Sequence, residues 1–195
     1  TSMEDTVVIV TGLPRSGTSM LMGMLEAGGL SILSDGVRNA DEDNPRGYYE
    51  LERVKRLHRR ADWLLNAQGK VVKIVAPLLP LLPIKKDIIY HVIVLERDLG
   101  EVIASQRKML ERRKKEGGRF SEEQLRRILA RQMAQARSFL QKNGIPHLRL
   151  NYARSVAAPL AASREIAEFL GGIPSAEAMA RAVDGGLYRN RRGGA

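Results

Sequence analysis

The chain has 195 residues, of which 44% are hydrophobic and 28% charged, so it can bury the core of one domain. It has no cysteine, which excludes disulfides, thiolate metal sites and cysteine nucleophiles, and its three histidines lack metal-ligand spacing, so we expect no metal site. The net charge of +10 indicates an anionic partner: a nucleic acid, a membrane surface, or a polyanionic nucleotide with an acidic acceptor.

The first half of the chain alternates strand-like and helix-like segments. A β-branched run predicts a buried parallel strand at 7–10, and apolar residues at helical spacing predict a helix at 17–27. A loop at 30–44 and a helix within 45–66 follow. A second strand is expected at 71–76, after which the prolines at positions 77, 80 and 83 predict an irregular connection.

The second half continues the same alternation. We expect a third strand at 88–95, a helix at 98–116 broken by Gly117-Gly118, a long helix from the capping-box sequence at 121–124 to residue 142, a fourth strand at 147–152, and helices at 159–170 and 175–183. This order predicts an α/β fold of three layers, in which helices flank a mostly parallel sheet of about four to five strands. We interpret residues 1–195 as a single domain with a mobile basic segment at 107–121.

The segment between the first strand and the first helix has the composition of a phosphate-binding loop. Gly12 and Gly17 let the backbone curl so that successive N–H groups and the start of the helix face an anion. Arg15 adds a cation, and hydroxyl groups come from Ser16, Thr18 and Ser19. The spacing of the glycines matches the P-loop of nucleotide hydrolases, but a threonine occupies the position of the lysine. Ordinary ATP or GTP hydrolysis would therefore lose a main support.

The sequence Gly-Leu-Pro-Arg-Ser-Gly-Thr-Ser of this loop resembles the 5′-phosphosulfate loop of sulfotransferases, especially the Pro-Arg-Ser-Gly-Thr form of tyrosylprotein and many bacterial members. The resemblance implies a P-loop fold and sulfuryl transfer from 3′-phosphoadenosine 5′-phosphosulfate (PAPS) to a hydroxyl or amine, leaving 3′-phosphoadenosine 5′-phosphate (PAP). It requires no metal. Arg15 takes the place of the missing lysine as a catalytic cation. The implied nucleotide-binding residues of the loop are Pro14, Arg15, Ser16, Gly17, Thr18 and Ser19.

Two further motifs agree with this resemblance. Arg97 ends the third strand and Ser105 follows eight residues later, which matches the 3′-phosphate site of the family. Lys73 matches the catalytic lysine that neutralises the leaving phosphate. The family's histidine, a general base, falls on Val75, so a histidine base is absent.

The resemblance also suggests where a base and a closing segment would lie. Tyrosylprotein-type members use an acidic residue after the first helix, which makes Glu42 the first candidate for the base and Asp43 the second. The Asn-Pro-Arg-Gly-Tyr sequence at 44–48 resembles bacterial members. Near the C-terminus, Arg189 is the candidate for a basic residue that closes over the nucleotide.

Three alternatives stay open. A P-loop kinase or NTPase would use Glu96 or Asp98 as a magnesium ligand, and a non-catalytic nucleotide-binding protein would explain the valine at position 75. Nucleic-acid binding through 107–119 is disfavoured, since Phe120 is the only aromatic residue beside that stretch. We expect a nucleotide and an unidentified acceptor as partners, no nucleic acid and no membrane span, and a cytoplasmic location; a homodimer remains one option for the assembly.

Overall fold

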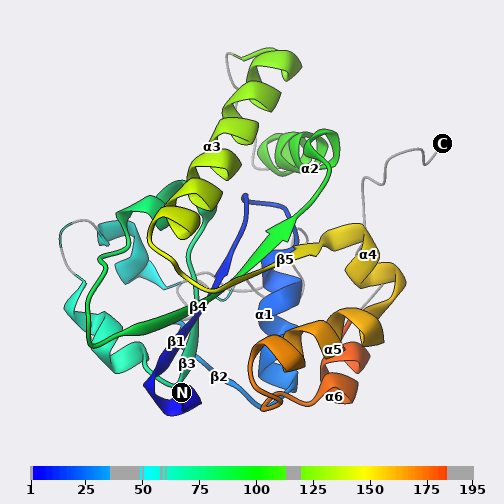
Figure 1. Ribbon diagram of the computed structural model, residues 1–195. Helices are drawn as coiled ribbons and strands as arrows, with labels where there is room; N and C mark the ends of the chain where they lie inside the picture. Colours follow the sequence, from blue (N-terminus) through cyan, green and yellow to red (C-terminus); the bar gives the residue numbers. More distant parts are fainter. Residues whose placement is uncertain are drawn as a thin grey trace.

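The computed structural model describes residues 2–35, 49, 51–57, 59, 61–112 and 120–183. Within these residues, five strands form one sheet with parallel pairing throughout (Figure 1). The strands are β1 (Thr6–Thr11), β2 (Ser31–Ile32), β3 (Lys70–Lys73), β4 (Ile89–Glu96) and β5 (His147–Asn151). Their spatial order is β2-β3-β1-β4-β5, with β1 at the centre. The predicted α/β fold with a parallel sheet is confirmed.

The apolar run of β1 is buried because both faces of the sheet are covered. Val7 and Ile9 belong to one hydrophobic cluster, whereas Val8 and Val10 belong to a second cluster on the opposite face. This alternation follows from the two-residue period of a strand. A central strand of a parallel sheet is therefore apolar at every position, as this segment of β1 is.

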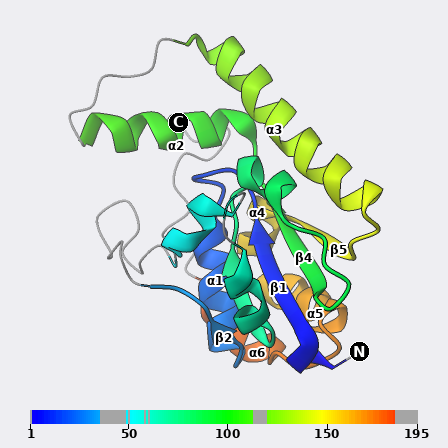
Figure 2. The ribbon, with the colours of Figure 1, turned by 90° about the vertical axis from the view of Figure 1, so that its left-hand side faces the viewer.

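The helices form a layer on each side of the sheet (Figure 1). One layer contains α1 (Thr18–Ala27), α5 (Pro159–Phe169) and α6 (Ala176–Arg181), and α4 (Tyr152–Ala157) leads into it from β5. The other contains the 3₁₀ helices η2 (Glu52–Arg56), η3 (Asp62–Ala67) and η4 (Ala76–Leu81), together with α3 (Glu122–Lys142). The strands point toward α2 (Leu99–Arg112) and the first turns of α3, so these helices stand over the carboxyl ends of the strands (Figure 2).

The capping box at the start of α3 is present. The Gln124 N–H donates to Ser121 Oγ at 3.2 Å, and the Ser121 N–H donates to Gln124 Oε1 at 2.8 Å. The predicted end of this helix at residue 142 is also confirmed. None of the described helices combines the length and the apolar composition that crossing a membrane requires.

The prediction of a helix within 45–66 is wrong for the described part of that range. The structure has η2 and η3 there instead of an α-helix. Leu51, Val54 and Leu57 are buried at intervals of three residues, which is the period of a 3₁₀ helix, whereas Leu65 is 43% exposed. A spacing of three residues between buried positions fits both an α-helix and a 3₁₀ helix. Packing against the sheet favours the 3₁₀ helix, which has fewer residues per turn.

Several short elements differ from the sequence-based expectation. The two-residue strand β2 lies in the predicted loop 30–44, and α4 and the 3₁₀ helix η1 (Met3–Asp5) were not predicted. β3 ends at Lys73 rather than at 76, and η4 occupies part of the connection expected to be irregular. The described part of α2 ends at Arg112, and the predicted break at 117–118 lies outside the described residues.

Candidate functional site

The loop between β1 and α1 has the backbone of an anion-binding loop. Arg15 and Gly17 have φ angles of 69° and 98°, in the left-handed region, and the Ser16 N–H donates to the Leu13 carbonyl oxygen at 3.1 Å. Left-handed residues alternating with right-handed ones direct successive N–H groups to one side. Gly17 is also the N-cap of α1 and contributes no side chain to cap it. The positive end of the helix dipole therefore adds to the loop N–H groups.

Two glycines are required by the close packing of this loop. A Cβ atom at Gly17 would lie 2.3 Å from Tyr152 Cδ2, in addition to the strain of its positive φ. A Cβ atom at Gly12 would lie 2.7 Å from Ser16 Oγ and 2.8 Å from the Leu95 carbonyl oxygen. The glycines thus let the loop pack directly against β4 and the start of α4.

Residues from the loop, from the end of β4 and from α2 meet around Arg15. Its Nε donates to Ser105 Oγ at 3.0 Å, although the two residues are 90 positions apart. Its carbonyl oxygen accepts a hydrogen bond from Arg97 Nη1 at 3.1 Å. Gln106 Nε2 also donates to the Pro14 carbonyl oxygen at 3.1 Å. The structure therefore brings Arg15, from the loop motif, together with Arg97 and Ser105, from the second motif.

Arg97 is held by a buried network. Its Nε lies 3.1 Å from Glu101 Oε2, and the side chains of the pair are only 7% and 5% exposed. The Arg97 guanidinium carbon lies 4.6 Å from the centre of the Tyr152 ring, a cation–π arrangement. The Glu101 N–H in turn donates to Asp98 Oδ1 at 3.1 Å. These contacts fix the guanidinium beside the phosphate loop.

Lys73 lies next to the base of the loop. It ends β3 in register with Val10 of β1, and its side chain is buried. The chain continues alongside β1 beyond the strand, because Ile74 N–H donates to the Val10 carbonyl oxygen and Ala76 N–H to that of Gly12, both at 2.9 Å. Val75, at the position of the family's histidine, therefore stands close to the loop as well.

The hydroxyl-bearing residues of the loop differ in exposure. Ser16 and Thr18 are 1% and 6% exposed, while Ser19 is half-buried and Pro14 is exposed. Ser16 Oγ is buried and finds no hydrogen-bond partner among the described residues. Three other residues expected in the site, Glu42, Asp43 and Arg189, lie outside the described residues.

The sequence analysis missed two residues of this network. Glu101 lies in the first turn of α2, four positions after Arg97 in the connection from β4, and this short separation of opposite charges was the available signal. Tyr152 comes directly after β5, so it lies at the same edge of the sheet as Arg97 after β4. Its position after a strand was the only available signal, because packing against Gly17 is a tertiary contact.

Comparison with known proteins places this geometry in a known fold. No protein-family model matches the chain, and no curated protein matches it in sequence. Solved structures do match. The sulfotransferase domain from the curacin biosynthetic pathway aligns over 94% of this chain and 80% of its own, with a TM-score of 0.55 and 16% identity. A sulfotransferase from Alicyclobacillus acidocaldarius aligns over 88% and 84%, with a TM-score of 0.53 and 16% identity.

The fold is that of sulfotransferases. A third match is retinol dehydratase, solved with androsterone and the inactive cofactor PAP, with a TM-score of 0.54 and 18% identity. It aligns over 90% of this chain and 62% of its own length, so this chain spans less than two thirds of that protein. The expected P-loop architecture is thereby confirmed. Across the described residues, no group of three or more histidine, aspartate or glutamate side chains is placed to hold a metal ion.

Proposed function

We propose that this protein is a sulfotransferase, which binds PAPS and transfers its sulfuryl group to a hydroxyl or amine acceptor. The observation that carries the proposal is the convergence of Arg15, Arg97 and Ser105 around one loop. Sequence motifs assign these residues separately to the phosphosulfate and the 3′-phosphate. The sulfotransferase fold supports the same function independently of the motifs.

The loop fits a nucleotide of this kind. Its left-handed residues, the uncapped start of α1 and the cation of Arg15 provide donors for a 5′-phosphate without a P-loop lysine. Ser105 and Arg97 both contact Arg15 and would hold the 3′-phosphate. The hydroxyl groups of Ser16, Thr18 and Ser19 add polar groups to the loop, and Pro14 completes its frame.

In the proposed reaction the protein positions the two reactants and stabilises the negative charge that develops during transfer. PAPS supplies the sulfuryl group when bound. Arg15 would stabilise negative charge on the transferring oxygens, and Lys73, at the base of the loop, would neutralise charge on the leaving phosphate. Lys73 stands at the end of β3, and Arg15 is held in the loop by its hydrogen bond to Ser105, so both cations are positioned before the reaction. Glu42 remains our first proposal for the base and Asp43 the second, with Arg189 as the proposed closing residue.

The kinase or NTPase alternative is weakened by the acidic residues it would need. Glu96 accepts hydrogen bonds from Arg137 at 3.0 Å and from Arg149 at 3.1 and 3.2 Å. Asp98 caps the start of α2 through the Glu101 N–H. Both carboxylates are therefore engaged in structural contacts, and neither is poised as a magnesium ligand.

Calorimetric titration tests the proposal. PAP should bind in the presence of a metal chelator, because the site supplies its own cations, and ATP with magnesium should bind more weakly. Arg15→Gln should weaken PAP binding about tenfold or more, the effect expected for losing a charged hydrogen bond. Arg164→Gln, an exposed change on α5, is the matched control. Binding of ATP with magnesium but not of PAP would overturn the proposal in favour of a kinase or NTPase.

A turnover assay separates an enzyme from a non-catalytic nucleotide-binding protein. PAP release from PAPS would be measured with a panel of phenols and amines. Lys73→Met should abolish acceptor-dependent release while leaving a folded protein that binds PAP. Acceptor-dependent release that survives in Lys73→Met would contradict the role of this lysine.

A further inference from the structure

A pocket lies beside the loop of residues 12–19, on the side of the sheet covered by α3. Its volume is about 230 Å³, and its walls come from the loop, the end of β4, the start of α2, α3 and β5. The residues of α1 and α6 that pack on the other face of the sheet do not contribute to it. Arg15 and Lys73, the two cations of the proposed reaction, do not line it either. The pocket is therefore not where the proposed transfer takes place.

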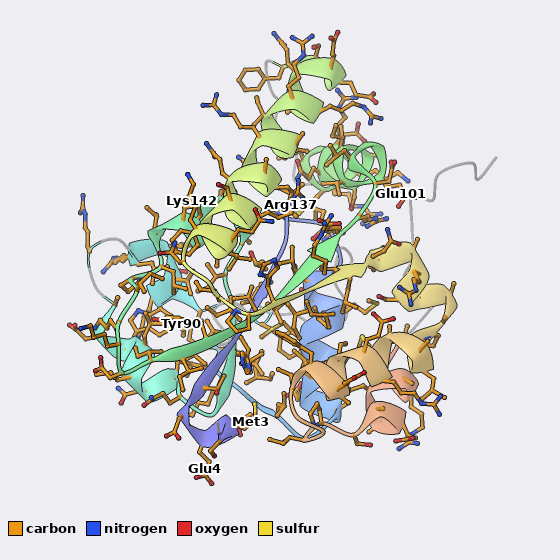
Figure 3. All side chains as sticks on the ribbon, viewed as in Figure 1. Met3, Glu4, Tyr90, Glu101, Arg137 and Lys142 are labelled. Atoms are coloured by element: carbon orange, nitrogen blue, oxygen red, sulfur yellow. The ribbon has the colours of Figure 1, made fainter. Side chains whose placement is uncertain are left out.

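The polar part of the lining carries excess positive charge. It contains Arg97, Arg137 and Arg149 but only one carboxylate from the described residues, that of Glu96. Arg97 is already neutralised by Glu101. Arg137 and Arg149 both bond to Glu96, so two guanidinium groups share one carboxylate. Arg137 projects from α3 toward the end of β4 (Figure 3). The Arg137–Glu96–Arg149 trio thus carries a net charge of one positive unit.

This trio is also accessible. The side chains of Arg137 and Arg149 are 33% and 58% exposed, and that of Glu96 is 28% exposed. A carboxylate is the planar anion that a guanidinium recognises with two parallel hydrogen bonds. The resident carboxylate of Glu96 shows this geometry with Arg149. A guanidinium has five N–H donors, so a second carboxylate entering the pocket could bond to those that Arg137 and Arg149 do not direct at Glu96.

The remaining lining is apolar and includes Leu13, Leu95, Leu99 and Met133. An engineered cavity of about 150 Å³ holds one benzene molecule, so this pocket has room for a single ring with a short side chain. Ser16 also lines it, although its hydroxyl oxygen is buried. The pocket thus combines apolar side chains with an arginine pair, a lining suited to an amphipathic anion.

We infer that this pocket binds a small organic monoanion, with a carboxylate against Arg137 and Arg149 and an apolar body against Leu13, Leu99 and Met133. The ligand is a second molecule beside the nucleotide, because the pocket shares only Ser16 and Arg97 with the described residues assigned to the nucleotide. It contacts the loop through Leu13 and Ser16. This inference does not depend on the identity of the nucleotide.

Phenylacetate is the probe, with phenylacetamide as the neutral analogue of the same shape. The methyl group of Met133 reports the pocket in a spectrum of methionine methyl signals, assigned with Met133→Leu. Met22, which is buried in α1 on the other face of the sheet, is the internal control. Phenylacetate should shift the Met133 signal and leave that of Met22 unchanged, and phenylacetamide should bind about tenfold more weakly, since it forgoes a charged hydrogen bond.

Two variants should act in opposite directions. Arg149→Gln should weaken phenylacetate binding about tenfold or more, since it removes half of the guanidinium pair. Glu96→Gln should strengthen it several-fold, because both arginines lose their resident carboxylate. Thermal unfolding of each variant confirms that it is folded before the titration is interpreted.

Several results would overturn the inference. They are the absence of a Met133 shift, equal binding of the acid and the amide, or the same direction of change in both variants. Displacement of phenylacetate by PAP would also overturn it, because the pocket would then belong to the nucleotide site. Failure of PAP to bind would contradict the proposed function but would not contradict the assignment of this pocket.

Discussion

At the scale of single residues, the conformation of the loop between β1 and α1 depends on Gly17. Its φ of 98° is strained for any other residue, and a Cβ atom there would lie 2.3 and 2.4 Å from two carbons of the Tyr152 ring. The Tyr152 ring packs against the loop at Gly17 and also contacts the Arg97 guanidinium. A change at Gly17 therefore disturbs both the backbone and the position of Arg97.

Gly17→Ala should lower the free energy of unfolding by about 2 kcal/mol or more, because backbone strain adds to a steric clash with a buried ring. Gly144→Ala is the control, since Gly144 has a φ of 60° but a Cβ atom added there would meet nothing within 4 Å. That change should cost only about 1 kcal/mol, the strain alone. Chemical denaturation measures both. Equal losses in the two variants would contradict the clash with Tyr152.

The buried Arg97–Glu101 pair leads to a second prediction. Glu101→Leu should lower the free energy of unfolding by about 3–5 kcal/mol, because it leaves a buried guanidinium without its carboxylate. The double variant Arg97→Leu, Glu101→Leu should recover part of that loss. The exposed pair of Lys55 and Glu52, with side chains 63% and 50% exposed, is the control. Glu52→Gln should cost less than about 1 kcal/mol, and a similar loss for both glutamates would show that burial of the pair does not matter.

At the scale of elements, sequence periodicity predicted the longer strands and helices, in which the pattern of buried residues fits only one type of secondary structure. The strands β1, β4 and β5 and the helices α1, α3, α5 and α6 were expected near their observed bounds. The 3₁₀ helices of 52–67 were mistaken for an α-helix because buried residues every three positions fit either type. β2 has only two residues and α4 six, too few for a periodic signal.

Tyr90 links β4 to the proline-rich connection and makes stability depend on pH. Its hydroxyl donates to the Pro83 carbonyl oxygen at 2.9 Å, and burial, with a smaller contribution from Asp87, raises the pKa of Tyr90 to about 12. A raised pKa means that the folded state favours the neutral phenol. Its contribution is therefore complete below the ordinary pKa near 10 and is lost as the pH rises toward 12.

Tyr90→Phe should cost about 1 kcal/mol at pH 7, the net value of the lost hydrogen bond. The difference between the native chain and the variant should shrink as the pH rises from about 10 to 12, because only the native chain must ionise a buried phenol. Urea denaturation at a series of pH values measures it. A difference that stays constant over this range would rule out a raised pKa at Tyr90.

At the scale of the whole molecule, the carboxyl ends of parallel strands gather residues from distant parts of the chain. Arg15, Lys73, Arg97 and Ser105 come from four segments, and the sequence motifs proposed all four as site residues; the structure brings Arg15, Arg97 and Ser105 into contact. The two residues that hold Arg97, which are Glu101 and Tyr152, and the pocket beside the loop were not predicted. Glu101 lies only four positions from Arg97, so it could have been proposed from the sequence. Tyr152 and the pocket arise where helices pack against strand ends, and no local pattern in the sequence records such a contact.

The proposed function requires one site that holds a nucleotide with phosphates at both its 5′ and 3′ positions. Titration calorimetry can compare the affinities of PAP and adenosine 5′-phosphate, which lacks the 3′-phosphate, for the native chain and for Ser105→Ala. We predict that the native chain binds PAP at least about tenfold more tightly, and that Ser105→Ala narrows this ratio by removing a hydrogen bond to a charged group. Equal affinities for the two nucleotides in the native chain would contradict a 3′-phosphate site.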